Sequence, residues 1–545
     1  MLLPQHTVAT EKKKLLGGVA VLMPATLFTK LVGLFYKIPL IAIVGVGGMA
    51  YFLAAYHVYS LLFVLSATGL PTALSLQIAR TASGEARAGV ARIFRVSLAL
   101  FLSLGILGTA LLLWGAPLIA ARIAMHDATA AIVAIAPALF LSAFIGAAKG
   151  FFQGHQRMLP TAVAEVLEAA GKLGFGLCLA LLAKRQGEPA PIVAAYAIFG
   201  ITAGLALSAI FLFIRLLVWR VMHRNAQPQA RGELPTRRRV LTTLVGEALP
   251  ITVSASVMSI VSLIDTAMIS NRLQGAGFAP AAAHALYSAY GNLAVPLYNL
   301  VPSLLSPVTL ALMPLLGASF AKGDRKGGAM ALTTALRLSL LIAIPAALGL
   351  GVFARPILSL IYRNAGEAIG VAAPALSLLA AAVIPAVLIG VIGSALQATG
   401  HTLLPVVAMG AGALIKLTLE ICLLPVAGIY IYAAPASTLV CNLAVLLIEG
   451  VALARVLQTS AISVGDLLRP LLAAAVAVGG SAALYLWLAA RFGEQIWQMP
   501  LALLLAAMLY LFFALQCRAV GEDELLALPR GEQLCRVLAR IKLLK

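Results

Sequence analysis

The stretch Gly150–Leu179, GFFQGHQRMLPTAVAEVLEAAGKLGFGLCL, sets the architecture, because a related stretch returns later in the chain. The second copy is Gly393–Leu423, GSALQATGHTLLPVVAMGAGALIKLTLEICL. Both copies contain Gly-His, a short turn, a proline, an apolar helix and then Lys-Leu, followed by Cys-Leu at the same spacing. Because ordered self-similarity indicates an internal repeat, the sequence predicts two like halves that face each other across a basic cavity.

The composition is that of a polytopic membrane protein. The 545 residues are 62% hydrophobic and 11% charged, and the mean hydropathy is +1.02. Soluble proteins carry about 25% charged residues. The net charge of +20 is explained by basic residues on the cytoplasmic rim, so no nucleic acid partner is expected. The five cysteines show no pairing or metal spacing and are expected to be packing thiols.

About twenty apolar residues span a bilayer, and this length predicts fourteen transmembrane helices in an all-α protein. The predicted spans are 15–44, 49–79, 91–115, 128–154, 159–183, 191–219, 241–271, 280–320, 330–353, 370–399, 403–424, 428–457, 467–490 and 496–517. Lysine and arginine are concentrated in alternate connections, which predicts that both termini are cytoplasmic.

The repeat and the charge pattern together predict the domains. Residues 1–219 form a first six-helix lobe, a basic cytoplasmic linker covers 220–240, and a second lobe covers 241–457. Two additional helices occupy 458–520, and an amphipathic basic tail, 521–545, lies on the membrane surface. Because six spans precede the second copy, both halves insert the same way up, as a parallel repeat. The alternative is that the echoes arise by chance in a sequence rich in Ala, Leu and Pro.

Lysines near the middle of predicted spans are the main functional signal, because a charge in hydrocarbon is costly. Lys30 and Lys37 are seven residues apart on one helical face, and Lys172 and Lys416 are equivalent positions of the repeat. Together they favour an anionic ligand. Two other interpretations stay open, since Lys37 could snorkel to the interface and the other two lysines each have a glutamate four residues away.

The predicted site has two parts. The substrate-binding cations are Lys30, Lys37, Arg80, Lys172 and Lys416, with Glu165, Glu168, Tyr56 and Asn292 as supporting polar residues. A predicted coupling site consists of Asp265, Glu420, Asn442 and Thr438, whose oxygen atoms suit Na⁺ or a proton. Equally, these residues could form a buried network with Lys416, which would then serve as a built-in cation. No other metal and no cofactor are expected.

Enzyme signatures are missing from the sequence. Gly171-Lys172 is followed by Leu173 rather than Ser or Thr, so it is no Walker A motif, and no metalloprotease or nucleophile-elbow pattern occurs. The sequence therefore predicts a transporter driven by a gradient or by substrate supply.

Three motifs resemble a known family. They are Lys30–Pro39 (KLVGLFYKIP), Gly69–Ser75 (GLPTALS) and Gly150–Thr161 with Glu168. They are similar to the polysaccharide-export branch of the MATE-like superfamily, and to the stage V sporulation protein B group with its MurJ-type lipid II flippases. The resemblance implies fourteen helices, two lobes and alternating access to a central cationic cavity.

The resemblance also implies a substrate and site roles. Lys30 and Lys37 stand where relatives have cavity cations, and Asp265 and Glu420 resemble positions near a sodium site. Lys416 stands where such relatives have a neutral amide, which argues against sodium dependence. We therefore expect a monomeric flippase in the bacterial cytoplasmic membrane, acting in wall assembly, cell shape or sporulation. Its partners would be membrane lipids and an undecaprenyl-pyrophosphate-linked glycan, lipid II.

Three alternatives remain at this stage. The chain could export another undecaprenyl-linked polysaccharide, because head-group selectivity depends on cavity shape. It could be a multidrug or organic-cation antiporter of the same superfamily, which would need an acidic cavity. It could also be a scaffold for sporulation or wall assembly that transports nothing.

Overall fold

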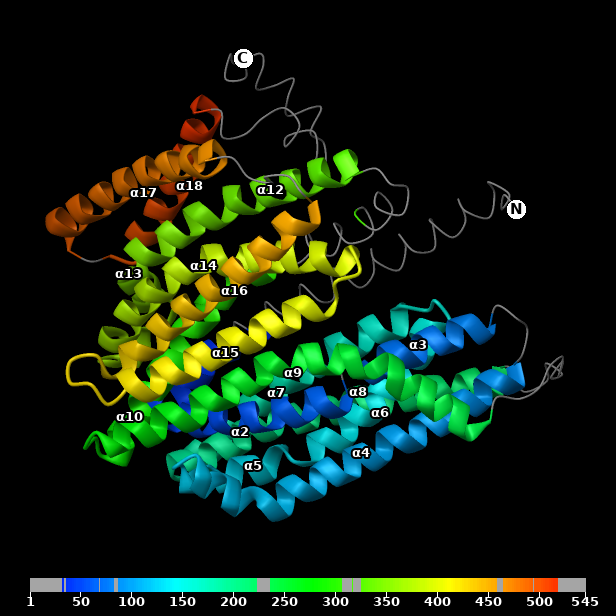
Figure 1. Cartoon of the computed structure of the whole chain (residues 1–545). Helices are drawn as coiled ribbons and strands as arrows, with labels where there is room; N and C mark the ends of the chain where they lie inside the picture. The colour runs from blue at the N-terminus through cyan, green and yellow to red at the C-terminus, as the bar shows by residue number, and fades with distance from the viewer. Residues whose placement is uncertain are drawn as a thin grey trace. The chain divides into compact units, whose positions relative to one another are not determined.

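The computed structural model describes residues 32–33, 36–67, 69–82, 87–222, 236–305, 316, 325–457, 464–493 and 495–517, and the regular secondary structure of these residues is entirely helical (Figure 1). The earlier helices are α2 (Val46–Ala67), α3 (Gly69–Ala82), α4 (Arg87–Arg122), η1 (His126–Ala128), α5 (Thr129–Ile135), α6 (Pro137–Gly154), α7 (Leu159–Arg185), α8 (Ala190–Met222), α9 (Arg237–Gly275) and α10 (Pro280–Ser288). The later ones are the π-helix η2 (Ala289–Ala294), α12 (Arg325–Val352), α13 (Ala354–Ile361), η3 (Arg363–Ala365), α14 (Ala368–Ala398), α15 (Leu403–Leu423), η4 (Tyr430–Tyr432), α16 (Ala433–Leu457), α17 (Val464–Phe492) and α18 (Gln498–Gln516).

Among these residues, 11 helical segments are long and apolar enough to cross a membrane, and each corresponds to one predicted span. The seventh predicted span, 241–271, lies within α9, whose 39 residues also exceed the length needed. The first predicted span lies mostly outside the described residues, and the eighth lies partly outside them. The predicted all-α membrane fold is confirmed, and the total of fourteen helices is consistent with it.

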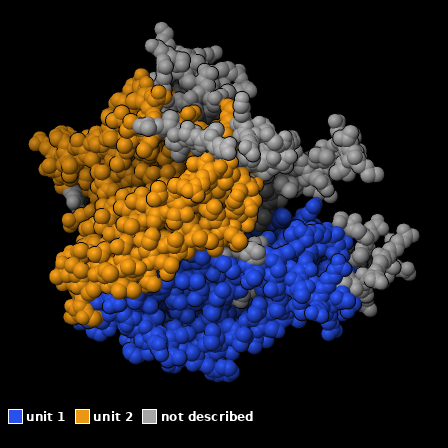
Figure 2. Space-filling view, in the orientation of Figure 1, with its two compact units in different colours: residues 1–274, 279–288 blue, residues 275–278, 289–545 orange. Residues whose placement is uncertain are grey.

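The chain packs as two compact units, which Figure 2 shows in different colours. Unit 1 comprises residues 1–274 and 279–288, and unit 2 comprises 275–278 and 289–545. Packing therefore groups α9 and α10 with the earlier helices, whereas the predicted lobe boundary lies at the basic linker 220–240. That boundary follows the sequence repeat rather than the packing, and it stays a prediction.

The two copies of the repeated stretch form the same local structure. Each is a helix, a turn of about four residues and a second helix, α6 and α7 in unit 1 and α14 and α15 in unit 2. In unit 1, α6 packs between α4 and α8, and α7 packs on α8. In unit 2, α14 packs between α12 and α16, and α15 packs on α16. The same helix neighbours recur, as a structural repeat requires.

Glycine and proline place the breaks between helices. Gly45 has a φ of +82°, which ends the helix over 36–44 and lets α2 begin at Val46. Pro137 is the first residue of α6, where its missing N–H has no partner to lose. These breaks lie inside or beside long apolar runs, so hydropathy alone does not locate them.

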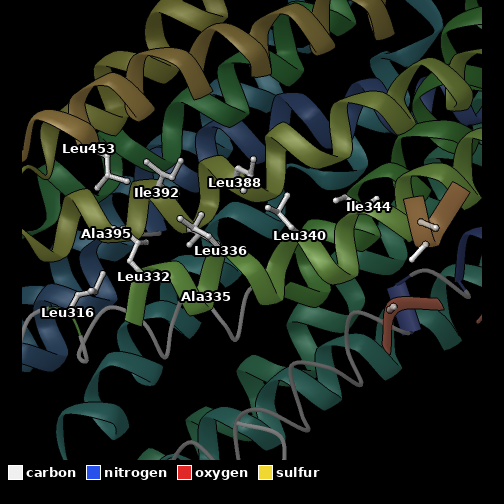
Figure 3. Close-up of a cluster of buried hydrophobic side chains, with 14 of the residues drawn as sticks. Leu316, Leu332, Ala335, Leu336, Leu340, Ile344, Leu388, Ile392, Ala395 and Leu453 are labelled. Carbon is white, nitrogen blue, oxygen red and sulfur yellow. The ribbon is translucent and has the colours of Figure 1, made fainter. Parts of the chain in front are cut away.

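The core of unit 2 joins the two additional helices to the rest of the unit. Leu332, Leu336, Leu340 and Ile344 form one buried face of α12, because residues four apart lie above one another on a helix (Figure 3). Residues of α14, α16, α17 and α18 complete this cluster. The hydroxyl of Tyr510 on α18 donates a hydrogen bond to the carbonyl of Leu341, at 2.7 Å. Two long helices are thereby fixed to α12.

Candidate functional site

A cluster of charged and aromatic side chains lies inside unit 1, centred on Lys172 of α7. The Lys172 ammonium lies 5.3 Å from the ring centre of Tyr36 and 5.8 Å from that of Tyr56 on α2. Cations within about 6 Å of an aromatic face are attracted by its quadrupole. The two rings therefore offset part of the cost of holding this lysine in an apolar span.

Two further lysines and two glutamates surround this centre. Lys37 lies near enough to Lys172 for the two charges to repel each other. Lys149 of α6 forms an ion pair with Glu165 of α7, with 3.6 Å between Nζ and Oε1. Glu168 interacts with both Lys149 and Lys172. The cluster thus holds three cations against two anions, and all five side chains are partly accessible rather than sealed in the core.

Close helix packing positions the aromatic part of the cluster. Gly171 and Gly176 of α7 face Gly204 and Gly200 of α8, so closely that a Cβ on Gly200 would lie 2.2 Å from the Cα of Gly176. Small residues let membrane helices approach in this way. The space beside Gly176 also admits the hydroxyl of Tyr36, which donates a hydrogen bond to the carbonyl of Ala197 at 3.0 Å. The glycines therefore fix the ring that Lys172 covers.

A second polar group in unit 1 joins α2, α9 and α10. The Oγ1 of Thr266 lies 2.8 Å from Nδ1 of His57 and 2.8 Å from the hydroxyl of Tyr287, and the last two are 3.3 Å apart. Thr266 and Tyr287 are buried and His57 is half-buried. These three side chains therefore link three helices in the interior of unit 1. Sequence reasoning did not identify Thr266, because a single threonine in an apolar span carries no distinctive pattern.

The other predicted residues of unit 1 occupy different positions. Arg80 forms an ion pair with Glu247 of α9, and its side chain is 60% exposed. Asp265 lies on α9, within unit 1. Lys30 lies outside the described residues. The roles of all three stay predictions.

In unit 2, Lys416 and Glu420 of α15 form a buried pair. Their Nζ and Oε1 atoms are 3.7 Å apart, and Ser437 of α16 donates a hydrogen bond to the same oxygen at 3.1 Å. The exposed fraction is 5% for Lys416 and 0% for Glu420. The pairing proposed as a structural alternative for these residues is therefore present, and it ties α15 to α16.

Further along α16 from this pair, an amide and a hydroxyl side chain contact tyrosine hydroxyls. Asn442 donates to the hydroxyl of Tyr298 at 2.8 Å, and Thr438 lies 3.5 Å from the hydroxyl of Tyr290. Asn292 is fully buried in the π-helix η2, a type of helix that occurs often at functional sites. Three of the four predicted coupling residues thus lie in one unit, Glu420, Thr438 and Asn442. The fourth, Asp265, belongs to unit 1, so the combined site stays a prediction.

Lys149 and Glu449 are among the charged residues within the predicted spans that the sequence prediction did not include. Lys149 lies in the apolar run of α6, and Glu449 lies in α16 with no exposed surface. Both stand inside predicted spans, where an ionisable residue is a functional signal by default. That rule applied to every span would have found them. Among the described residues, no group of three His, Cys, Asp or Glu is placed to hold a metal ion.

Comparison with curated proteins gives relatives in Bacillus subtilis. The chain is 27% identical over 425 residues to the uncharacterized membrane protein YabM, covering 78% of this chain and 77% of YabM. It is 24% identical over 360 residues to stage V sporulation protein B, covering 66% of this chain and 68% of that protein. It is 25% identical over 366 residues to lipid II flippase MurJ, covering 64% of this chain and 66% of MurJ.

Solved structures show the same fold. An inward closed conformation of lipid II flippase MurJ matches with a TM-score of 0.67 and 16% identity, covering 91% of this chain and 98% of MurJ. An inward-facing MATE multidrug transporter also gives a TM-score of 0.67 at 16% identity, covering 79% of this chain and 94% of the transporter. The chain therefore shares the fold of these two proteins, as the predicted resemblance to the MATE-like superfamily implied.

Two family models match overlapping parts of the chain. Residues 250–421 match the MatE family. Residues 15–320, more than half of the chain, match the family described as polysaccharide biosynthesis protein. The chain therefore belongs to the polysaccharide biosynthesis protein family.

Proposed function

We propose that this protein is a flippase for an undecaprenyl-pyrophosphate-linked glycan, with the peptidoglycan precursor lipid II as substrate. The observation that supports this most is the cluster of Lys37, Lys149 and Lys172 in unit 1, where cations outnumber anions. A pyrophosphate carries the complementary charge. The similarity to MurJ and to stage V sporulation protein B supports the same substrate class.

The physical basis is electrostatic. Charges interact several times more strongly near apolar surroundings than in water, so a few fixed lysines attract a pyrophosphate out of the membrane interface. Lys172 is held by aromatic rings rather than by a full ion pair, which leaves its ammonium able to contact an anion. The hydrocarbon tail of the substrate would remain in the bilayer while the head group crosses by alternating access.

Purified protein in vesicles tests the proposal directly with fluorescent lipid II. Lys172→Gln and Lys37→Gln each remove one cation of the cluster, and we expect at least a tenfold loss of flipping rate, about 1.4 kcal/mol of lost stabilisation. The matched control is Arg185→Gln, which removes an exposed charge from the end of the same helix. Wild-type flipping by Lys172→Gln, or an equal loss in the control, would contradict the proposal.

The buried pair of Lys416 and Glu420 in unit 2 leads to a proposal about ion coupling. Because Lys416 is buried beside Glu420, we propose that it replaces the coupling cation that Glu420, Thr438 and Asn442 would otherwise bind. Flipping should then proceed at the same rate when K⁺ or choline replaces Na⁺ on both sides of the vesicle. A rate that falls severalfold without Na⁺ would contradict this proposal.

A second candidate function is export of organic cations, which the acidic residues Glu165 and Glu168 favour. The match to the MatE family and to a multidrug transporter fold makes this the natural alternative. Efflux of a cationic dye that is lost in Glu168→Gln, together with no lipid II flipping in the wild type, would establish it over the flippase.

A further inference from the structure

A recess of about 390 Å³ lies within unit 2, away from the Lys416 cluster. Its walls are α13 and η3 on one side and α17 with the start of α18 on the other. Its volume falls within the range of about 300–1,000 Å³ that is typical of ligand pockets. None of the functional roles argued above uses it.

The recess lies at the ends of candidate membrane spans. The spans of α12 and α17 end at Val352 and Phe492, and those of α14 and α18 begin at Ala368 and Gln498. Tyr485, on the wall of the recess, lies seven residues before the end of α17, which is about 10 Å along the helix. The recess therefore extends from the ends of these spans about two helical turns into the apolar part of α17.

Two arginines give the recess its charge. Arg355 of α13 and Arg363 of η3 both line it and are both exposed. Neither forms a salt bridge with any described residue, and no acidic side chain lines the recess. Tyr362, between them in sequence, is instead buried, and burial raises the pKa of its hydroxyl to about 12, so it remains neutral. Among the described residues that line it, the recess thus has two positive charges and no negative one.

The opposite part of the recess is apolar and has exposed apolar residues on its rim. Phe353 and Met499 are buried in its floor, where Phe353 contacts the ring of Tyr485 edge-on at 6.2 Å between centres. Leu486 and Ile496, on its rim, are 66% and 59% exposed. Trp487 and Trp497 are exposed beside them, as aromatic side chains often are at a membrane interface. One ligand could thus contact the arginines with a polar group and the apolar rim with a hydrocarbon chain.

We propose that this recess binds an anionic glycerophospholipid, with its phosphate between Arg355 and Arg363 and an acyl chain along Leu486 and Ile496. Guanidinium groups bind phosphate through paired charge-assisted hydrogen bonds. In a zwitterionic headgroup the neighbouring ammonium is repelled by the same arginines, so the net attraction is weaker. The lipid would join α13 to α17 and α18. This proposal concerns a site separate from the lysine cluster and does not depend on the proposed flippase activity.

The experiment uses the full-length protein, purified in detergent, stripped of lipid and titrated with phosphatidylglycerol in native mass spectrometry. Phosphatidylcholine with the same acyl chains serves as the zwitterionic comparison, which carries no net charge. We expect the wild type to bind phosphatidylglycerol at least tenfold more tightly than phosphatidylcholine. Arg355→Gln with Arg363→Gln should remove most of that preference, and Ser359→Trp, which fills the recess and keeps both arginines, should weaken phosphatidylglycerol binding severalfold.

The matched control is Arg122→Gln with Arg185→Gln, which removes two exposed charges from helix ends in unit 1. This variant should keep the preference, and thermal unfolding should show that all variants are folded. Unchanged preference in the Arg355 and Arg363 variant, or an equal loss in the control, would overturn the proposal. Binding of undecaprenyl phosphate without binding of phosphatidylglycerol would also overturn it and would assign the recess to polyprenyl lipids.

Discussion

At the scale of single residues, the buried pair of Lys416 and Glu420 makes the clearest prediction about stability. Lys416→Met leaves the carboxylate of Glu420 buried without its cation, although Ser437 still donates a hydrogen bond to it, and breaking such pairs typically costs about 3–5 kcal/mol. Lys416→Met with Glu420→Leu removes both charges and should recover most of that loss. Thermal unfolding of the purified proteins measures both changes. Additive losses in the double variant would show that the two residues do not stabilise each other.

Glu449 is a buried glutamate whose replacement should stabilise the protein, in contrast to the replacement of Lys416. Its carboxyl oxygens are buried beside Gly393 of α14, and it has no hydrogen bond or ion pair with any residue that the structure describes. Removing an unsatisfied buried polar group is stabilising by about 1–3 kcal/mol. Glu449→Leu should therefore raise the unfolding temperature, whereas Glu420→Leu alone should lower it. A fall in the Glu449 variant would mean that the carboxyl is satisfied in the folded protein.

At the scale of elements, the contact of α7 with α8 should control the geometry of the Lys172 cluster. A Cβ on Gly200 would lie 2.2 Å from backbone atoms of α7, so Gly200→Ala must push the helices apart, which typically costs about 1–3 kcal/mol. Flipping should fall with it, because α7 carries Lys172. The control is Gly174→Ala on α7, where a Cβ meets nothing within 4 Å and helix propensity alone predicts a gain of up to about 1 kcal/mol. Equal effects in both variants would contradict the close approach.

The elements also show what sequence alone could establish. Hydropathy located the spans because apolar length is a local property, and the repeat placed Lys172 and Lys416 on equivalent helices α7 and α15. The pairing of Lys416 with Glu420 was one of two open interpretations, which spacing on one helix could not separate. The aromatic rings over Lys172 come from segments more than one hundred residues away, so no local pattern reveals them. The Arg355 and Arg363 recess depends on tertiary packing in the same way.

At the scale of the whole molecule, the repeat predicts that equivalent turns lie on the same side of the membrane. The turns after α6 and α14 contain exposed Gln156 and Thr402, and those after α7 and α15 contain exposed Glu188 and Ala427. In a variant with alanine in place of the native cysteines, single cysteines at Gln156 and Thr402 should react with an impermeant maleimide only from the cytoplasmic side. Cysteines at Glu188 and Ala427 should react only from outside, because an even number of spans separates the copies. Labelling of Gln156 and Thr402 from opposite sides would make the repeat inverted and would contradict the predicted parallel repeat.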